Sequence, residues 1–341
     1  MTNSRNKFRK HIDNVISKSN RAIFASMSLA RNVMGNLLSA RTHFKIFDTQ
    51  VRPIIEFGAP VWYSPANCKH LDYIQTSYMK RALGVGKSTS HTALYGETGR
   101  YPIELRLQYA VIKYWLRIEH MSDETILKCI QNELNSNEDL ISHNWIKTVK
   151  SCLMAAGIIS TFKTELPKVP LKDHKVFLKT IRTTLESNFR TKWLHEIKDG
   201  NKNPILRTYN QFKLSHSPEP YINLSANRVY QKNISKFRLS SHCLRIHTGR
   251  FEKILPHQRY CLFCSLNVVD NEIHFLTECQ HHRVERELFY SEIEHIHRNI
   301  HSMPAQDIFL AIMNSTNVDV INALGKFISS GFRARNKSME V

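Results

Sequence analysis

Four residues that can bind a metal ion fall within one short window of the chain, and their spacing restricts how that region can fold. The pattern is Cys261-x2-Cys264-x9-His274-x4-Cys279. The two-residue gap lets two thiolates approach one ion from a tight turn, and the histidine and third cysteine then complete a tetrahedral site. Three thiolates and one imidazole with no open position are typical of structural zinc. The sequence therefore predicts a small zinc knuckle that holds one ion.

The spacing of the second ligand pair predicts a break in the helix that carries it. Residues five apart on an ideal α-helix diverge by about 140° around its axis, so His274 and Cys279 cannot share one ion from the middle of a helix. The turn that contains His274 must end or tighten before Cys279, and a longer helix is expected afterwards, over about residues 281–300. Asp270 and Asn271 are suitable caps for the first turn.

Other residues offer alternatives to this ligand set. His281 or His282 could replace His274, although either would lie almost adjacent to Cys279 at poor geometry. A second alternative is that the thiols are unrelated and the histidine lies on the surface. The cysteines outside the window with apolar neighbours in helix-like runs are expected in the core: Cys68, Cys129 and Cys152.

The charge of the chain predicts a polyanionic partner. Lys and Arg number 48 against 29 Asp and Glu, which gives a formal net charge of +19. Such a field favours nucleic acid or an anionic membrane surface, because an unneutralised excess repels itself in a compact state. A solvated basic surface that serves only solubility is the alternative. Nucleic acid, RNA or DNA or both, is the predicted partner; protein partners are unknown from the sequence.

Membrane and secretory features are missing from the sequence pattern. No stretch of about 18 uninterrupted apolar residues occurs, and the polar N-terminus has no apolar signal core behind it. Seven cysteines with irregular spacing do not suggest a secreted disulfide framework. We therefore expect no membrane association and an intracellular location, in the nucleus, the cytoplasm or both.

A mainly α fold is expected, because 11 Gly and 11 Pro in 341 residues leave little material for a turn-rich β fold. Residues 103–118 are apolar on most faces, which predicts a buried helix. Gly84 lies where a left-handed C-cap would end the preceding helix. Residues 54–63 are apolar and contain Gly58 and Pro60, which is consistent with a short buried strand or an extended turn. A last helix is expected near residues 318–327.

Shifts in composition suggest four consecutive segments. Residues 1–118 form a helical region, and residues 119–227, which begin with an acidic stretch, form a helical connector. Residues 228–300 combine a basic segment with the zinc knuckle, and residues 301–341 hold a C-terminal helix and a basic tail.

Basic and aromatic residues beside the knuckle are candidates for nucleic-acid contact. Residues 228–260 hold many Lys and Arg but one acid, Glu252, and Tyr260 and Phe263 are interleaved with the knuckle. Single-stranded nucleic acid needs cations for its phosphates and aromatic faces for its bases; packing around zinc is the alternative for both aromatic residues. The predicted contacts are Arg238, Arg245, Arg250, Arg259, Tyr260 and Phe263, with Arg9, Lys10, Lys18 and Arg21 from the N-terminal helix. Arg250 could instead brace the knuckle through a carboxylate such as Glu272.

No catalytic motif is evident. Polymerases and many nucleases hold two metal ions with clustered carboxylates, and this sequence has no adjacent pair of aspartates. A phosphate-binding loop of the type G-x-x-x-x-G-K is also missing. We therefore expect this chain to be non-catalytic.

Several segments together resemble one protein family. The run V-R-P-I-I-E-F-G-A-P-V-W at residues 51–62, the helix-like stretch through Gly84, and the pattern G-E-x-G-x-x-P at residues 96–102 resemble the region after the polymerase core in non-LTR (LINE-type, jockey-like) retrotransposon reverse transcriptases. Residues 237–250, which lead into the knuckle, and its half E-x-H-x-L-x-x-C at residues 272–279 are similar to the zinc-binding end of these proteins.

The resemblance implies a thumb-like helical region, a connector and a zinc-binding end that holds RNA or a DNA target. The catalytic aspartates of the family would lie upstream of Met1, so the resemblance does not extend polymerase activity to this chain. The leading hypothesis is a non-catalytic nucleic-acid-binding fragment of such a protein. The alternative hypothesis is a zinc-stabilised helical module that binds acidic proteins, in which the knuckle acts only as a staple.

Overall fold

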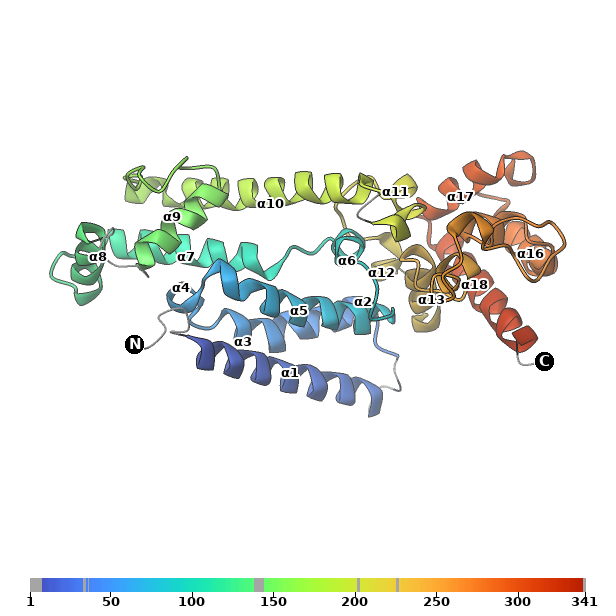
Figure 1. The fold of residues 1–341 in the computed structure, drawn as a ribbon, viewed down its shortest axis with the longest axis horizontal. Coiled ribbons are helices and arrows are strands. Elements are labelled where there is room, and N and C mark those ends of the chain that lie inside the picture. Colours follow the sequence, from blue (N-terminus) through green and yellow to red (C-terminus); the bar gives the residue numbers. More distant parts are fainter. Residues whose placement is uncertain are drawn as a thin grey trace. The chain divides into compact units, whose positions relative to one another are not determined.

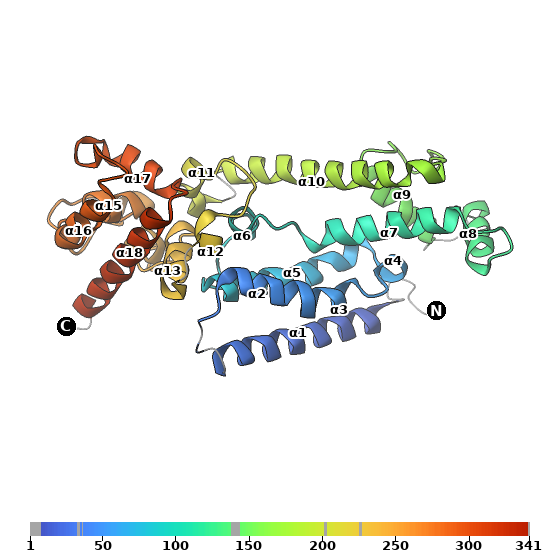
Figure 2. The ribbon, with the colours of Figure 1, turned by 180° about the vertical axis from the view of Figure 1, so that it is seen from behind.

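Helices make up the regular structure of the chain in the computed structural model, which describes residues 8–32, 35, 37–137, 144–200, 203–224 and 227–339. Figures 1 and 2 show these helices from opposite sides. Within these ranges no strands form a sheet; two isolated bridges, Thr98 with Pro218 and Tyr260 with Val269, are the β pairings. The structure confirms the predicted mainly α fold class.

The chain divides into two compact units, each made of separated stretches. Unit 1 comprises residues 1–26, 46–75 and 101–192, and unit 2 comprises residues 27–45, 76–100 and 193–341. The four consecutive segments expected from composition remain a prediction, and the ends of the first and last of them, residues 1–7 and 340–341, lie outside the described residues.

The helices are assigned to these units as follows. Unit 1 holds α3 (Arg52–Glu56), α4 (Ala59–Trp62), α7 (Ile103–Glu119), α8 (Ile126–Ser136) and α9 (Trp145–Ala155). Unit 2 holds α6 (His91–Thr98), α11 (Tyr209–Phe212), α12 (Pro220–Leu224), α13 (Arg228–Arg238), α14 (Arg245–Thr248), α15 (Glu272–Thr277), α16 (Arg283–Ile293), α17 (Ala305–Met313) and α18 (Val318–Met339). Helices with residues in both units are α1 (Arg9–Asn32), α2 (Ala40–Ile46), α5 (Pro65–Leu83) and α10 (His174–Lys198).

Helix α7 forms the centre of unit 1, where it packs against α4, α8 and α9. Its buried side chains lie on most of its faces: Ile103, Leu107, Val111, Ile112, Trp115, Leu116 and Ile118. The Trp145 indole N–H donates to the Pro60 carbonyl at 2.7 Å, which ties α9 to α4. The structure confirms that the all-round apolar sequence of residues 103–118 forms a buried helix.

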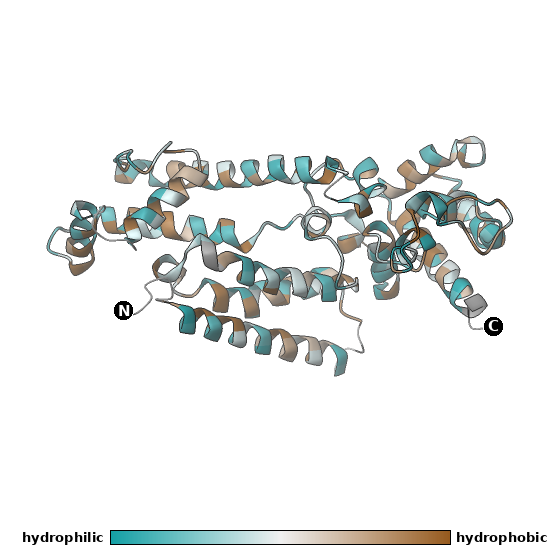
Figure 3. Cartoon of the chain, in the orientation of Figure 1, coloured by the Kyte–Doolittle hydropathy of each residue, from teal (hydrophilic) through white to brown (hydrophobic). Residues whose placement is uncertain are grey.

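Helix α1 has a buried apolar side and a charged side. Ile12, Val15 and Ile23 are buried, whereas Lys18 and Arg21 are exposed. Figure 3 shows hydrophobic and hydrophilic residues alternating along this helix, as expected when one face packs and the other meets water.

Residues 54–63 are helical, so the predicted strand or extended turn is wrong. Pro53 lies in the first turn of α3, which follows the π-helical segment Phe47–Val51 without a break. Gly58 then has a left-handed φ of 66°, which lets the chain leave α3 and enter α4 at once. The Trp62 indole N–H donates to the Phe57 carbonyl at 2.8 Å and closes the turn. Gly84 also has positive φ, 72°, and ends α5 as predicted.

Helix α18 forms the centre of unit 2, where it packs closely against α13 and α16. A Cβ at Gly325 would lie 2.4 Å from Tyr230 Cβ on α13, and a Cβ at Gly331 would lie 2.6 Å from Phe275 Cζ on α15. The helix is longer than the predicted range of 318–327. Its buried face continues through Gly331 and Arg335, and a prediction based on the spacing of apolar residues overlooks both because neither is apolar.

Among the described helices, none alone has the length and apolar content of a membrane span; the bent pair α17 and α18 reaches it only when both helices are counted together.

Candidate metal centre

A short antiparallel pairing brings the first two candidate ligands beside α15. Tyr260 bridges to Val269, and the Cys261 amide donates to the Val268 carbonyl at 2.9 Å. Asn267 has a φ of 49°, which turns the chain back between the two sides of this pairing. The segment with Cys261 therefore lies against the segment that enters α15.

Helix α15 ends where ligand geometry requires it to end. The Asn271 side chain caps its start by accepting from the His274 amide at 2.8 Å. The helix stops at Thr277, and the Cys279 amide donates to the His274 carbonyl at 2.8 Å. A 3-10 turn at residues 280–282 follows, and then α16 begins. This arrangement confirms the predicted break, although α16 ends at Ile293, before the predicted residue 300.

The four predicted ligands meet at one point. Their ligand atoms all lie within 4.8 Å of one another. Cys261 Sγ lies 3.9 Å from Cys279 Sγ, and Cys264 Sγ lies 3.5 Å from His274 Nε2. Tetrahedral zinc, with bonds of about 2.3 Å to sulfur and 2.0–2.1 Å to nitrogen, separates two sulfurs by about 3.8 Å and a sulfur from a nitrogen by about 3.5 Å. The cluster could therefore hold one metal ion.

The Cys261 and Cys279 thiols are close enough to hydrogen-bond, at 3.9 Å between their sulfurs. The hydrogen bond with Cys279, followed by burial, raises the pKa of Cys261 to about 12. The same hydrogen bond from Cys261 lowers the pKa of Cys279, against the effect of burial and with help from the charge of Arg335. A metal ion would displace these protons, so its binding is coupled to pH.

Arg335 of α18 is a buried arginine that lies behind the sulfurs, with 1% of its surface exposed. Its Nη2 lies 3.8 Å from Cys279 Sγ and 4.0 Å from Cys261 Sγ. Its Nη1 donates to Asp270 Oδ2 at 2.7 Å. A divalent ion with three thiolates carries a net charge of about −1, so a fixed guanidinium beside the sulfurs stabilises that anion.

Aromatic rings and His282 hold Arg335 in place. Its guanidinium carbon lies 4.8 Å from the centre of the Phe263 ring and 5.1 Å from that of Phe275. Its Nε donates to His282 Nε2 at 2.9 Å. Burial, then the charge of Arg335, lowers the pKa of His282 to about 3, so this histidine is neutral and can accept. Phe263, predicted as a stacking residue, is half-buried against Arg335 and the His281 ring, as its packing alternative stated.

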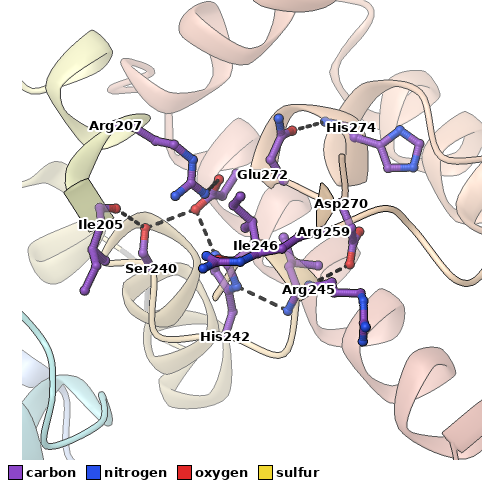
Figure 4. Close-up of polar contacts among 12 residues, drawn as sticks. Ile205, Arg207, Ser240, His242, Arg245, Ile246, Arg259, Asp270, Glu272 and His274 are labelled. Carbon is purple, nitrogen blue, oxygen red and sulfur yellow. Dashed lines mark hydrogen bonds and ion pairs between the residues drawn. The ribbon is translucent and has the colours of Figure 1, made fainter. Parts of the chain in front are cut away.

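A buried carboxylate joins the start of α15 to the end of α13. Glu272 accepts from His242 Nε2 at 3.0 Å, from Ser240 Oγ at 3.0 Å and from Arg207 Nη2 at 3.2 Å (Figure 4). Burial alone would raise its pKa, but the hydrogen bond and charge of His242, with the charge of Arg207, lower it to about 2. Arg207 thus occupies the bracing role that had been considered for Arg250.

Arg238 lies in the core of unit 2 and is not available to a ligand, with 4% of its side chain exposed. Its guanidinium donates to Glu97 at 2.6 Å, to Glu219 at 2.5 Å and to the Met313 carbonyl at 2.6 Å. The interpretation of this arginine as a nucleic-acid contact is therefore corrected: two carboxylates neutralise it, and they stabilise the packing of α6, α13 and the end of α17.

The other predicted contacts near the knuckle lie at or near the surface. Arg245 is paired with Glu252 at 3.0 Å, and Arg259 donates to the Ile254 carbonyl at 2.9 Å. Arg250 donates to Ser88 Oγ at 2.8 Å. Tyr260 is 40% exposed. The four predicted contacts on α1, all exposed, are Arg9, Lys10, Lys18 and Arg21.

Two functional residues were missed by the sequence analysis. Arg335 lies in what appeared to be a basic tail, and Arg207 lies in a stretch without any motif. The i, i+4 spacing of Gly331 and Arg335, which follow the apolar residues of α18, is a weak signal that Arg335 is buried. Nothing in the sequence distinguishes Arg207 from other surface arginines.

Comparison with models of known families, with characterised proteins and with solved structures gave no match.

Proposed function

We propose that this chain is a non-catalytic nucleic-acid-binding part of a reverse transcriptase of the non-LTR retrotransposon type, stabilised by one structural zinc ion. The observation that carries the binding proposal is the formal net charge of +19, with one acid among residues 228–260 next to the ligand cluster. A chain with such an excess gains free energy when phosphates neutralise it.

Zinc is the proposed ion because of the chemistry and spacing of its ligands. Cys261, Cys264, Cys279 and His274 supply three sulfurs and one nitrogen within 4.8 Å of one another, and soft ligands of this kind select zinc over hard cations such as magnesium. All four tetrahedral positions are filled by protein, which leaves none for a substrate or an activated water. The ion would therefore supply folding free energy and no chemistry.

Phosphate contacts are expected to dominate binding. Arginine and lysine side chains bind the phosphodiester backbone irrespective of sequence, so affinity should fall steeply with salt and discriminate little between bases. RNA and DNA single strands are both proposed ligands, because backbone contacts of this kind are common to the two.

A second candidate function is a zinc-stabilised protein-interaction module. Apolar side chains around the knuckle favour it: Phe251 and Leu262 are each 71% exposed, and Leu255 is 54% exposed. Exposed apolar side chains mark a protein-binding surface where they form one contiguous patch. If this function is correct, the basic side chains of the chain would form ion pairs with an acidic protein partner.

Titration of labelled single-stranded RNA and DNA across a salt series, with and without a zinc chelator, tests the proposal. Tight binding that falls steeply with salt and weakens on chelation supports nucleic-acid binding with the knuckle at the interface. Weak binding that is indifferent to zinc removes the proposal in favour of the interaction module. Cys68 and Cys152 are buried as predicted, but Cys129 is exposed, so its prediction as a core residue is wrong. Because Cys129 also lies outside the ligand cluster, it supplies the control: Cys129→Ser should respond to chelation as the unsubstituted chain does.

A further inference from the structure

Three arginines of unit 2 lie close enough for the charges of Arg207 and Arg250 to act on Arg259, and Arg207 pairs with the Glu272 carboxylate. Arg207 follows the 3-10 turn Pro204–Leu206, Arg250 follows α14, and Arg259 follows a second 3-10 turn. Figure 4 shows the Arg207 and Arg259 side chains extending from different segments toward Glu272. Arg250 is linked to the same group, because its Nη2 lies 3.5 Å from the His247 ring, which lies 5.8 Å from the ring of His242.

Hydrogen bonds hold two of these arginines in position, Arg259 to backbone carbonyls and Arg250 to a side-chain hydroxyl. Arg259 donates to the Ile254 carbonyl at 2.9 Å and to the Ile246 carbonyl at 2.6 Å. Its side chain crosses Gly249 so closely that a Cβ there would lie 2.9 Å from Arg259 Cγ. Arg250 donates to Ser88 Oγ at 2.8 Å. The guanidinium groups are therefore ordered before any ligand arrives, which reduces the entropy lost on binding.

The Glu272 carboxylate already accepts hydrogen bonds from its own neighbours, so it does not neutralise Arg250 or Arg259. Glu272 accepts from His242, Ser240 and Arg207. Among the described residues, Arg250 and Arg259 donate to neutral oxygens and pair with no carboxylate. Burial, and to a smaller extent the charges of Arg207 and Arg250, lowers the pKa of Arg259. An anion bound among these three cations would offset their like charges.

An exposed aromatic ring lies next to the cationic cluster. The Arg250 guanidinium carbon lies 4.6 Å from the centre of the Phe251 ring, and this ring is 71% exposed. The His247 ring flanks it at 5.9 Å. A cation for a phosphate and an open aromatic face for a base, on consecutive residues, suit one nucleotide of a single strand.

We infer that Arg250, with Arg207 and Arg259, binds a backbone phosphate of single-stranded nucleic acid, and that Phe251 stacks on an adjoining base. The inference rests on the proposed function and specifies which residues of unit 2 would contact the nucleic acid. It also selects Phe251, and not Phe263, as the stacking residue, because Phe263 is half-buried against Arg335.

The test measures the affinity of the full chain for a single-stranded oligonucleotide over a range of salt. Arg250→Gln should weaken binding and reduce the slope of log affinity against log salt by about 0.7, the loss of one phosphate contact. Arg250→Lys should restore most of the slope. Phe251→Ala should weaken binding of the single strand by about fivefold or more and leave duplex binding unchanged. Arg298→Gln removes an exposed arginine outside the cluster and is the matched control.

The outcomes separate the inference from the proposed function. If the unsubstituted chain binds but Arg250→Gln and Phe251→Ala behave as Arg298→Gln does, the location is wrong and the function stands. If the unsubstituted chain does not bind single strands at all, both are overturned. Unchanged unfolding temperatures of the variants establish that any loss arises at the binding site. Arg250 suits this purpose because its printed contacts, with Ser88 Oγ, the His247 ring and the Phe251 ring, include no carboxylate that the substitution would leave unpaired.

Discussion

The guanidinium of Arg335 donates to the carboxylate of Asp270 at 2.7 Å, and this contact joins the last helix of the chain to the segment that enters the metal cluster. Both side chains are almost fully buried, at 1% and 2% exposure. Asp270 also accepts from the Arg245 amide at 2.8 Å, so the carboxylate holds α14 as well. The position of α18, the start of α14 and the segment that enters the candidate metal cluster are therefore tied together through one carboxylate.

Replacement of Arg335 should weaken metal binding without removing a ligand. In Arg335→Met the sulfurs lose a nearby cation and Asp270 is left buried without its partner. Loss of such an outer contact typically lowers metal affinity by about 10- to 100-fold. Competition between the protein and a chromophoric zinc chelator would measure this change.

Arg333 provides the control for this experiment, because it lies on the same helix and is exposed. Arg333→Met should leave zinc affinity unchanged. Equal affinities for the two variants would mean that Arg335 serves packing alone.

The ligand cluster was predictable from the sequence because coordination geometry is local. The spacing of Cys261, Cys264, His274 and Cys279 restricted the turn and the helix end within a few residues, and the structure has both. Even the cap at Asn271 follows from the residue type and its place before α15.

Charged residues outside the cluster were not predictable in this way, because the sequence does not show which acid a base will meet. Arg238 was interpreted as a surface contact, yet its partner Glu97 lies 141 residues away along the chain. In the sequence, Arg335 looks like any arginine of a basic tail; it is buried only because α18 packs against α13 and α16. In both cases long-range packing, and not local pattern, decided between burial and exposure.

Loss of one ligand should release the metal and unfold the region around it. Cys264→Ser removes a thiolate from a site whose binding free energy contributes directly to folding. We expect no stoichiometric zinc by elemental analysis, and faster proteolysis of residues 255–300 than of the rest of the chain. Cys129→Ser, an exposed cysteine elsewhere, should keep one equivalent of zinc. Retention of that equivalent by Cys264→Ser would require a ligand set different from the predicted one.

The buried pair of Arg238 and Glu97 should be a large contributor to the stability of unit 2. Glu97→Gln leaves a buried guanidinium with less compensating charge, which typically costs about 3 kcal/mol of unfolding free energy. Urea unfolding would measure it. The exposed pair Arg182 and Glu186, whose arginine side chain is 69% exposed, gives the comparison: Glu186→Gln should cost less than about 1 kcal/mol. Equal costs would show that Glu219 alone suffices for Arg238.

The stability of the chain should fall as pH drops below neutrality, and His43 should contribute to the loss. Burial, then the charges of Arg228 and Lys232, lowers the pKa of His43 to about 4. An unfolded histidine titrates near about 6.5, so between these values the unfolded chain binds about one more proton at this position than the folded chain. The contribution is fully present above the unfolded pKa and is lost progressively as pH falls toward the folded pKa.

Unfolding by urea at a series of pH values from neutral to 4 would measure this dependence. His43→Leu should reduce the slope of unfolding free energy against pH by about one proton over this interval. His195, an exposed histidine of the same unit, gives the control, because His195→Leu should keep the slope of the unsubstituted chain. Protonation of the metal ligands affects all three proteins alike, so the difference between the variants isolates His43. Identical slopes for His43→Leu and His195→Leu would mean that the acid sensitivity arises at other groups.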